Sequence, residues 1–219
     1  MTFPMKTVSI GVAGCAIAAG IGLTQAKSSS TIRERLGLEG YELVSDKSSI
    51  EAEVWKTRAT LYKDNAKNQD LLFDDLLPAN VKTEGTEIKE KCNSFTSGKM
   101  TVDSVGTSIY DKIVKLCTLD IKEYIKSHLS SGDAIMESNG AEEDWKEIFG
   151  QHKDQITQKY SDASETNARE KLSNFCNEIY LLKHSNKNRD DSSNAKSWCV
   201  KKAKPTTQKP SASTDGDTA

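Results

Sequence analysis

Hydrophobic residues in the body of the chain recur at helical spacing, with charged residues between them. The clearest case is a helix predicted from Asp162 to Lys183, whose single apolar stripe consists of Ala168, Leu172, Phe175, Cys176, Ile179 and Leu182. Residues 109–116 and 121–129 are predicted as two more helices, with Thr118 as a cap between them. The chain has only 4 Pro, and four of its 13 Gly lie before residue 23, so the body is poor in helix breakers. The pattern predicts a mainly α fold with minor short strands.

Two further helices are predicted around tryptophans. Ser48-Ser-Ile-Glu51 has the form of a capping box before EAEVWKTRATLYKDNAK, and Asn139-Gly-Ala-Glu142 is the equivalent start before the helix of Trp145. The apolar residues predicted to share one face of the first helix are Ile50, Val54, Leu61 and Tyr62. Trp55, Trp145 and Trp198 are predicted as core or half-buried anchors of the repeat. Residues 41–44 are predicted as a short strand, and residues 70–78 as a helical turn packed on the core.

A series of landmarks occurs twice in the same order. The corresponding pairs are Ile32 and Ile121, Trp55 and Trp145, Cys92 and Cys176, and Cys117 and Cys199, separated by 89, 90, 84 and 82 residues. This order predicts a duplicated unit of about 80–90 residues. The predicted organisation is a signal or membrane-anchor segment at 1–27, helical units at 28–118 and 119–200, and a tail at 201–219. The tail lacks aromatic residues, so it is predicted to be disordered.

Four of the five cysteines lie in the body of the chain: Cys92, Cys117, Cys176 and Cys199. Four cysteines allow three disulfide pairings, and four reduced thiols buried as small hydrophobes are the alternative. If the repeat holds, it favours pairing within each unit, Cys92 with Cys117 and Cys176 with Cys199. Each bridge would then constrain the unfolded chain by about 3 kcal/mol.

The N-terminal stretch Thr7–Leu23 is uncharged and rich in small residues, which leaves three interpretations. In order of preference, it is an uncleaved membrane anchor, a signal cleaved after Ala26, or a lipid attachment site at Cys15, because Val-Ala-Gly-Cys15 resembles a lipobox. Lys27, Arg33 and Arg35 follow the stretch, and the positive-inside rule would keep the body of an uncleaved anchor protein in the cytoplasm. The paired cysteines favour export instead, so the body is expected outside the cell membrane.

Motifs for catalysis and metal binding are missing from the sequence. His128, His152 and His184 are scattered and are interpreted as exposed helix residues, and no C-x-x-C, G-x-S-x-G or Walker loop occurs. The acidic run at 142–144 falls in the first turn of a predicted helix, where it complements the helix dipole. A net charge of −2 gives no support for nucleic-acid binding. We therefore expect no catalytic, metal-binding or cofactor-binding residues.

Several of these landmarks together resemble the paralogous families of short uncharacterised proteins of haemotropic mycoplasmas. The resemblance rests on the small-residue apolar N-terminus, the I-R-E and G-Y-E-L motifs between Ile32 and Leu43, the W-K…K-D helices, and Trp198-Cys199. It implies a surface-exposed, variable product of gene duplication with an N-terminal anchor or signal; no activity is established for these families.

The expected function is that of a membrane-anchored, surface-displayed, non-enzymatic protein. It would contact a host protein or vary to evade immune recognition, with the membrane bound through Thr7–Leu23. The alternatives are a small exported enzyme that uses scattered carboxylates and an intracellular structural protein with reduced thiols. The sequence indicates no oligomeric state.

Overall fold

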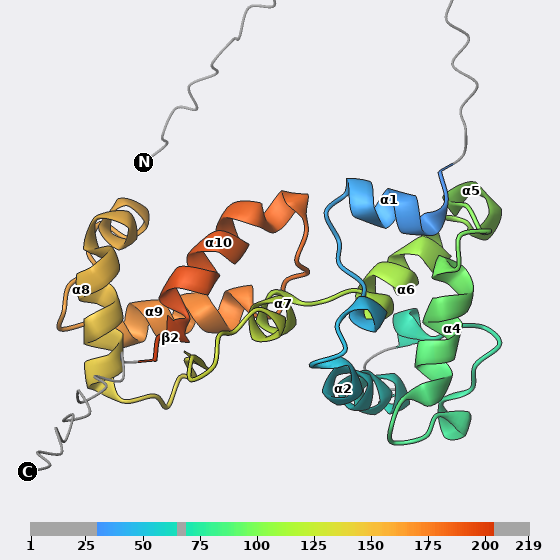
Figure 1. Ribbon diagram of the computed structural model, residues 1–219, viewed down its shortest axis with the longest axis horizontal. Coiled ribbons are helices and arrows are strands. Elements are labelled where there is room, and N and C mark those ends of the chain that lie inside the picture. The colour runs from blue at the N-terminus through green and yellow to red at the C-terminus, as the bar shows by residue number, and fades with distance from the viewer. Residues whose placement is uncertain (1–29, 65–68, 204–219) are drawn as a thin grey trace, which may run out of the picture.

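The computed structural model describes residues 30–64 and 69–203, and within them the prediction of a mainly helical fold is confirmed. The helices form two groups that meet near the middle of the chain (Figure 1). The first group contains α1 (Ile32–Leu38), α2 (Glu51–Lys63), α4 (Thr86–Thr96), α5 (Val102–Val105) and α6 (Thr107–Cys117). The second contains α7 (Ile121–Ser127), α8 (Glu142–Lys159), α9 (Ala168–Ile179) and α10 (Arg189–Trp198).

Short elements complete the two groups. They are the 3-10 turns η1 (Val44–Asp46), η2 (Gln69–Leu71), η3 (Pro78–Asn80) and η4 (Asn186–Asn188), and the strands β1 (Ala134–Ile135) and β2 (Val200–Lys201). The two strands pair antiparallel, with Ala134 opposite Lys201 and Ile135 opposite Val200. None of the helices in the described part of the chain combines the length and the apolar character that a membrane crossing requires.

Each group of helices has its own hydrophobic core. One core takes its buried residues from Ile32 to Leu119, and the other from Ile121 to Val200. The division falls one residue beyond the predicted boundary because the Leu119 side chain is fully buried in the first core. We refer to residues 30–119 as the first unit and to residues 120–203 as the second unit. All three tryptophans are buried, as predicted: Trp55 in the first core, and Trp145 and Trp198 in the second.

The two units begin in the same way. Each opens with a seven-residue helix, α1 or α7, whose first turn is closed by a capping box. In α1 the box joins Thr31 to Glu34, and in α7 it joins Asp120 to Glu123. Such a box satisfies two backbone N–H groups that the first turn of a helix leaves without partners.

Backbone pairing repeats between the units as well. Just before α1 the chain forms an isolated β-bridge between Thr31 and Thr101, and before α7 it forms one between Asp120 and Lys183. The Ile32 N–H donates to the Met100 carbonyl at 2.8 Å, and the Ile121 N–H donates to the Leu182 carbonyl at the same distance. The two units therefore share a backbone arrangement at the positions of the predicted repeat.

The predicted capping boxes of the two tryptophan helices are wrong. The N-caps are Ile50 for α2 and Ala141 for α8, and neither helix has a side-chain cap. Before α2 the chain forms a turn in which the Lys47 carbonyl accepts the N–H groups of both Ile50 and Glu51. That backbone turn takes over the hydrogen bonding that the Ser48 hydroxyl was expected to supply, and it lets the Ile50 side chain enter the core.

The predicted helix from Asp162 to Lys183 is too long at both ends, since α9 covers Ala168–Ile179. Residues before it form a turn closed by the Asn167 side chain, which accepts from the Ser164 N–H at 2.7 Å and donates to the Asp162 carbonyl at 3.0 Å. Five of the six predicted stripe residues are buried, whereas Leu182 is 39% exposed. Leu182 lies past the helix end because its carbonyl pairs with the start of α7.

Other local predictions are corrected by tertiary contacts. Residues 41–44 do not form a strand but a single bridge from Leu43 to Thr118, followed by η1. Thr118 does cap the chain between the two helices, as the C-cap of α6, and Asp120 is the N-cap of α7. Leu61 is partly exposed rather than on the buried face of α2. The turn at 70–78 does pack on the core, with Leu71 and Phe73 buried as predicted.

The predicted disordered tail begins too early. Lys201 belongs to β2, and the Lys202 side chain and the Ala203 N–H contact the Asp133 carboxylate at 2.9 and 3.0 Å. Residues 204–219 lie outside the described part of the chain, as do the stretch Thr7–Leu23 and Cys15.

Candidate functional site

The four cysteines of the body form two disulfides in equivalent places. Cys92 in α4 is joined to Cys117 at the end of α6, with an S–S distance of 2.02 Å. Cys176 in α9 is joined to Cys199, the residue after α10, with an S–S distance of 2.00 Å. This is the pairing within units that the repeat favours. All four residues are buried, so each bridge ties the last two long helices of its unit together from inside the core.

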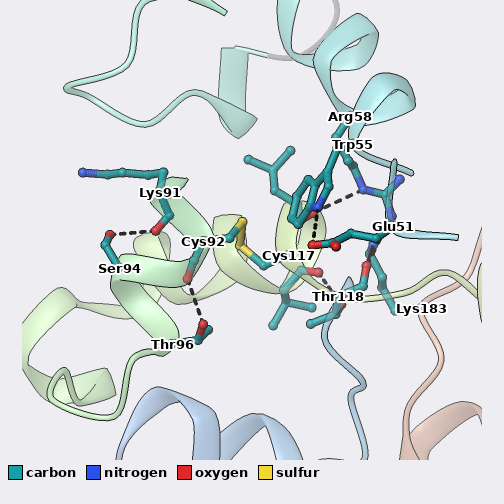
Figure 2. Close-up of a disulfide and its surroundings, with 12 residues drawn as sticks. Glu51, Trp55, Arg58, Lys91, Cys92, Ser94, Thr96, Cys117, Thr118 and Lys183 are labelled. Atoms are coloured by element: carbon teal, nitrogen blue, oxygen red, sulfur yellow. Dashed lines mark hydrogen bonds between the residues drawn. A yellow bond between two sulfur atoms is a disulfide. The ribbon is translucent and has the colours of Figure 1, made fainter. Parts of the chain in front are cut away.

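A cluster of charged side chains lies where the two units meet, and Figure 2 shows two of them, Arg58 and Lys183, near the first disulfide. Arg58 of α2 is only 3% exposed, and its guanidinium donates to the carbonyls of Leu116 and Thr118 at 3.3 and 3.2 Å. These two residues flank Cys117, so the disulfide fixes the acceptors that hold Arg58 in place. We call Arg58, Asp120, Glu123 and Lys183 the junction cluster.

The charges of the junction cluster balance across the boundary between units. The Arg58 guanidinium contacts the Glu123 carboxylate at 2.7 Å and the Asp120 carboxylate at 3.2 Å. The Lys183 ammonium contacts the other oxygen of Asp120 at 2.8 Å and donates to the Thr118 carbonyl at 2.8 Å. Two cations therefore face two anions, and Arg58 is the one charge of the four that the first unit contributes.

Burial shifts the titration of the cluster. Removal of the Lys183 ammonium from water, together with the nearby Arg58 guanidinium, lowers the pKa of Lys183 to about 8. Burial and the neighbouring Asp120 carboxylate raise the pKa of Glu123, against the attraction of Arg58. The side chains of Lys183 and Glu123 are only 17% and 15% exposed, so removing one partner leaves a costly unpaired charge.

A cleft of about 410 Å³ opens beside the junction cluster, between α2 and α7. Ile50 and Val54 supply apolar wall from the first unit, and Tyr180 and Leu181 supply it from the second. Leu181 is 82% exposed, which is unusual for a leucine. Ion pairs cross or border the cleft: Glu53 with Lys126 at 2.6 Å, between units, and Lys122 with Glu137 at 2.8 Å.

The histidines do not form a site together. His128 is exposed at the end of α7, and His152 is half-buried at a kink inside α8. His184 contradicts the prediction of an exposed helix residue: it lies in a loop, and its ring stacks on Tyr124 with the centroids 3.6 Å apart. Burial lowers the pKa of His184. Within the described residues, no group of three acidic, histidine or cysteine side chains could hold a metal ion.

The acidic run at the start of α8 is engaged in surface ion pairs. Glu142 and Glu143 both contact Lys146, at 2.9 and 3.3 Å, and Asp144 contacts Lys201 at 2.8 Å. The hydrogen bond from Lys146 lowers the pKa of Glu142. A lowered pKa keeps this carboxylate ionised and makes it a poor general acid.

Sequence reasoning missed the junction cluster. One signal was present: Arg58 lies one helical turn after Val54 and one before Tyr62, on the face that the periodicity assigns to the core. A second signal is the repeat, because the residue 90 positions later is the buried Ile148. Because Arg58 is charged and its counterpart Ile148 is apolar, Arg58 is expected to have a charged partner nearby. The sequence does not identify that partner as Glu123.

Comparison with known proteins gives no family for this chain. No protein-family model, no curated protein and no solved structure matches it.

Proposed function

We propose that this chain is a membrane-anchored, non-enzymatic protein that displays its two helical units outside the cell, where they contact a host molecule. The observation that carries the proposal is the pair of buried disulfides in equivalent positions. Structural disulfides persist in oxidising surroundings and are rare in reducing cytoplasm. The stretch Thr7–Leu23 supplies the expected attachment to the membrane.

The environment of the polar groups supports a binding role over catalysis. In the junction cluster, each carboxylate is paired with a cation and each cation also donates to a backbone carbonyl. These groups satisfy one another and so serve the docking of the two units. The cleft beside them combines exposed apolar surface with charged side chains, which is typical of surfaces that bind other molecules.

The resemblance to variable, duplicated surface proteins supports the same function. The disulfides and the two cores stabilise the scaffold from inside, so substitutions on exposed faces are expected to leave the fold intact. A scaffold of this kind accommodates surface variation, as antigenic variation requires.

The test of this proposal begins with thiol counting in protein isolated rapidly from its native cells. We expect none of Cys92, Cys117, Cys176 and Cys199 to react before reduction, and all four to react after reduction and denaturation. Four reactive thiols without reduction would reject export and favour an intracellular structural protein. The matched control is the same protein produced in a reducing cytoplasm.

Protease treatment of intact cells then tests display, and mass spectrometry of the native N-terminus tests attachment. We expect the body of the chain to be cleaved while cytoplasmic marker proteins survive. A chain that starts at Met1 indicates an uncleaved anchor, one that starts at Lys27 a cleaved signal, and one that starts at a lipidated Cys15 a lipoprotein. Complete survival of the body on intact cells would refute surface display.

A further inference from the structure

The two units touch mainly through polar groups. Each core belongs to one unit, and among the described hydrophobic side chains Tyr124 is the one that packs against both. The single covalent connection runs through Thr118, Leu119 and Asp120, between α6 and α7. An interface between parts of a chain that is small and polar is expected to allow relative motion, whereas a large apolar one is not.

The first contact between the units is the junction cluster. It is extended by the ion pair of Glu53 with Lys126, so α2 holds α7 through charged groups along its length. Such pairs gain little net free energy over solvated, separated groups, but they require one geometry. The cluster therefore determines how the units face one another more than how strongly they adhere.

The second contact joins the loop after α1 to η4. The Asn186 N–H donates to the Glu39 carbonyl at 2.8 Å, and its side-chain amide donates to the Leu38 carbonyl at 2.9 Å. Gly40 lies against it with φ +78°, and a Cβ atom there would come within 2.6 Å of the Asn186 backbone nitrogen. The chain can approach this closely only because residue 40 has no side chain.

The His184 N–H supplies another backbone link. It donates to the Leu119 carbonyl at 3.1 Å, and the His184 ring lies 3.8 Å from the Glu42 carboxylate. Leu119 is the last residue of the first unit and its side chain is buried in that core, so this hydrogen bond also crosses between the units. In the docked arrangement the amide hydrogens of His184 and Asn186 are therefore both bonded to carbonyls of the first unit.

We propose that residues 118–120 are a hinge and that the two units open about it, widening the cleft between α2 and α7 without unfolding either core. The junction cluster and the Gly40–Asn186 contact are the two latches that hold the closed form. Each unit keeps its own disulfide and its own core during opening, so the motion breaks only the contacts between units.

The experiment is amide hydrogen exchange followed by NMR on the full chain with both disulfides intact. The N–H groups of His184 and Asn186 report on opening. The references are the Ile32 N–H, bonded to Met100 within the first unit, and the Met136 N–H, bonded to Cys199 at 2.9 Å within the second. After correction for intrinsic exchange rates, we expect both reporters to exchange at least tenfold faster than both references.

Arg58→Met should speed exchange of the reporters a further tenfold or more and leave the references unchanged. Equal exchange of all four amides, or equal acceleration of all four by Arg58→Met, would show that the units open only by global unfolding and would overturn the proposal. An unchanged reporter rate in Arg58→Met would remove the junction cluster as a latch and overturn it equally.

Two glycine variants test the hinge even if the Arg58→Met variant does not fold. Gly40→Ala and Gly106→Ala both place a side chain at positive φ, +78° and +80°, but only Gly40 has atoms within 4 Å of the added Cβ. We expect Gly40→Ala to speed exchange of His184 and Asn186 at least tenfold and Gly106→Ala to leave those two amides unchanged. The same response in both variants would contradict the hinge.

Discussion

The two units have the same helical plan and differ most where they meet. α1 corresponds to α7, α2 to α8, α4 to α9 and α6 to α10, and each unit carries its disulfide between the last two of these helices. At the position where α2 has Arg58, α8 has Ile148, and both side chains are buried. Arg58 is covered by the second unit, whereas Ile148 packs within the core of its own unit.

The two units also differ in how the chain continues after their second cysteine. Thr118 and Val200 both follow the second cysteine of their units, yet the chain continues from Thr118 into α7, while Val200 pairs with Ile135 in the small sheet. The corresponding pairing in the first unit is a single bridge, Leu43 with Thr118. Both ends pair with their own unit, but the end of the first unit is also covered by the second unit, whose Lys183 ammonium donates to the Thr118 carbonyl at 2.8 Å. The residue at the position of Arg58 therefore differs according to whether the helix faces the other unit, as α2 does, or the core of its own unit, as α8 does.

The largest effect is expected when the residue of α2 is placed at the equivalent position of α8, by the substitution Ile148→Arg. Ile148→Arg would bury a charge in the second core with no carboxylate partner, and we expect it to destabilise that unit by about 4 kcal/mol. Urea unfolding followed by tryptophan fluorescence measures the loss. The control is Ile148→Val, which we expect to cost about 1 kcal/mol. A loss below 1 kcal/mol for the arginine would mean that α8 has a docking face like that of α2.

Removing the disulfides tests whether the units are equivalent inside. The bridges close loops of 25 and 23 residues, so the double variants Cys92→Ala/Cys117→Ala and Cys176→Ala/Cys199→Ala should each lose about 3 kcal/mol of unfolding free energy. Each double variant is the control for the other. If the two losses of unfolding free energy differ by more than about 2 kcal/mol, one unit depends more strongly on its disulfide than the other.

The pH dependence of stability tests the charge balance at the junction. The pKa of Lys183 is lowered in the folded state, so its charged form opposes folding below about pH 8, and this cost disappears as pH rises toward the unfolded value. We expect the free energy of unfolding to gain about 1 kcal/mol from this group between pH 7 and pH 9. Lys183→Met should abolish that gain, which urea unfolding at several pH values detects.

Lys115→Met is the matched control, because Lys115 lies beside the same surface but is half exposed and paired with Asp70. We expect it to keep the rise in stability between pH 7 and pH 9. A rise that persists in Lys183→Met, or that vanishes in Lys115→Met, would assign the effect to another group.

The smallest expected effect concerns the starts of the tryptophan helices. Neither α2 nor α8 has a side-chain cap, but Ile50 is buried at the first and Ala141 is exposed at the second. Ala141→Asp should therefore gain about 1 kcal/mol by accepting from the N–H groups of the first turn. Ala141→Gln, which is polar but a poor cap, should gain nothing. Thermal unfolding separates the two, and equal melting temperatures would contradict the assigned N-cap.

Much of the fold followed from local patterns in the sequence. The helical periodicity, the scarcity of Pro and Gly, and the two sets of landmarks predicted a mainly α protein with a repeat, and the buried tryptophans fit that prediction. Helix ends were predicted poorly, because the Lys47 carbonyl and the Asn167 side chain formed turns where continued helix or a serine cap was expected. Turns of this kind depend on which neighbours the folded chain supplies.

The candidate site was out of reach of the sequence for a different reason. Arg58 and Glu123 are 65 residues apart, and only the docking of α7 on α2 brings their side chains to 2.7 Å. The cysteines could be assigned to units because the repeat orders them along the chain. Arg58 has no charged counterpart in the second unit, so the repeat offered no guide to its partner.

By itself, the sequence determined the helical class, and it predicted a repeat and several of the buried residues of each core, because these depend on spacing along the chain. Only the tertiary structure decided which charges are buried together, where the cleft lies and that the units meet through polar latches. The physical reason is that a charged side chain is buried by the segments that pack over it, and these segments can be distant in the sequence. For Arg58, that covering comes from a helix beyond the end of its own unit.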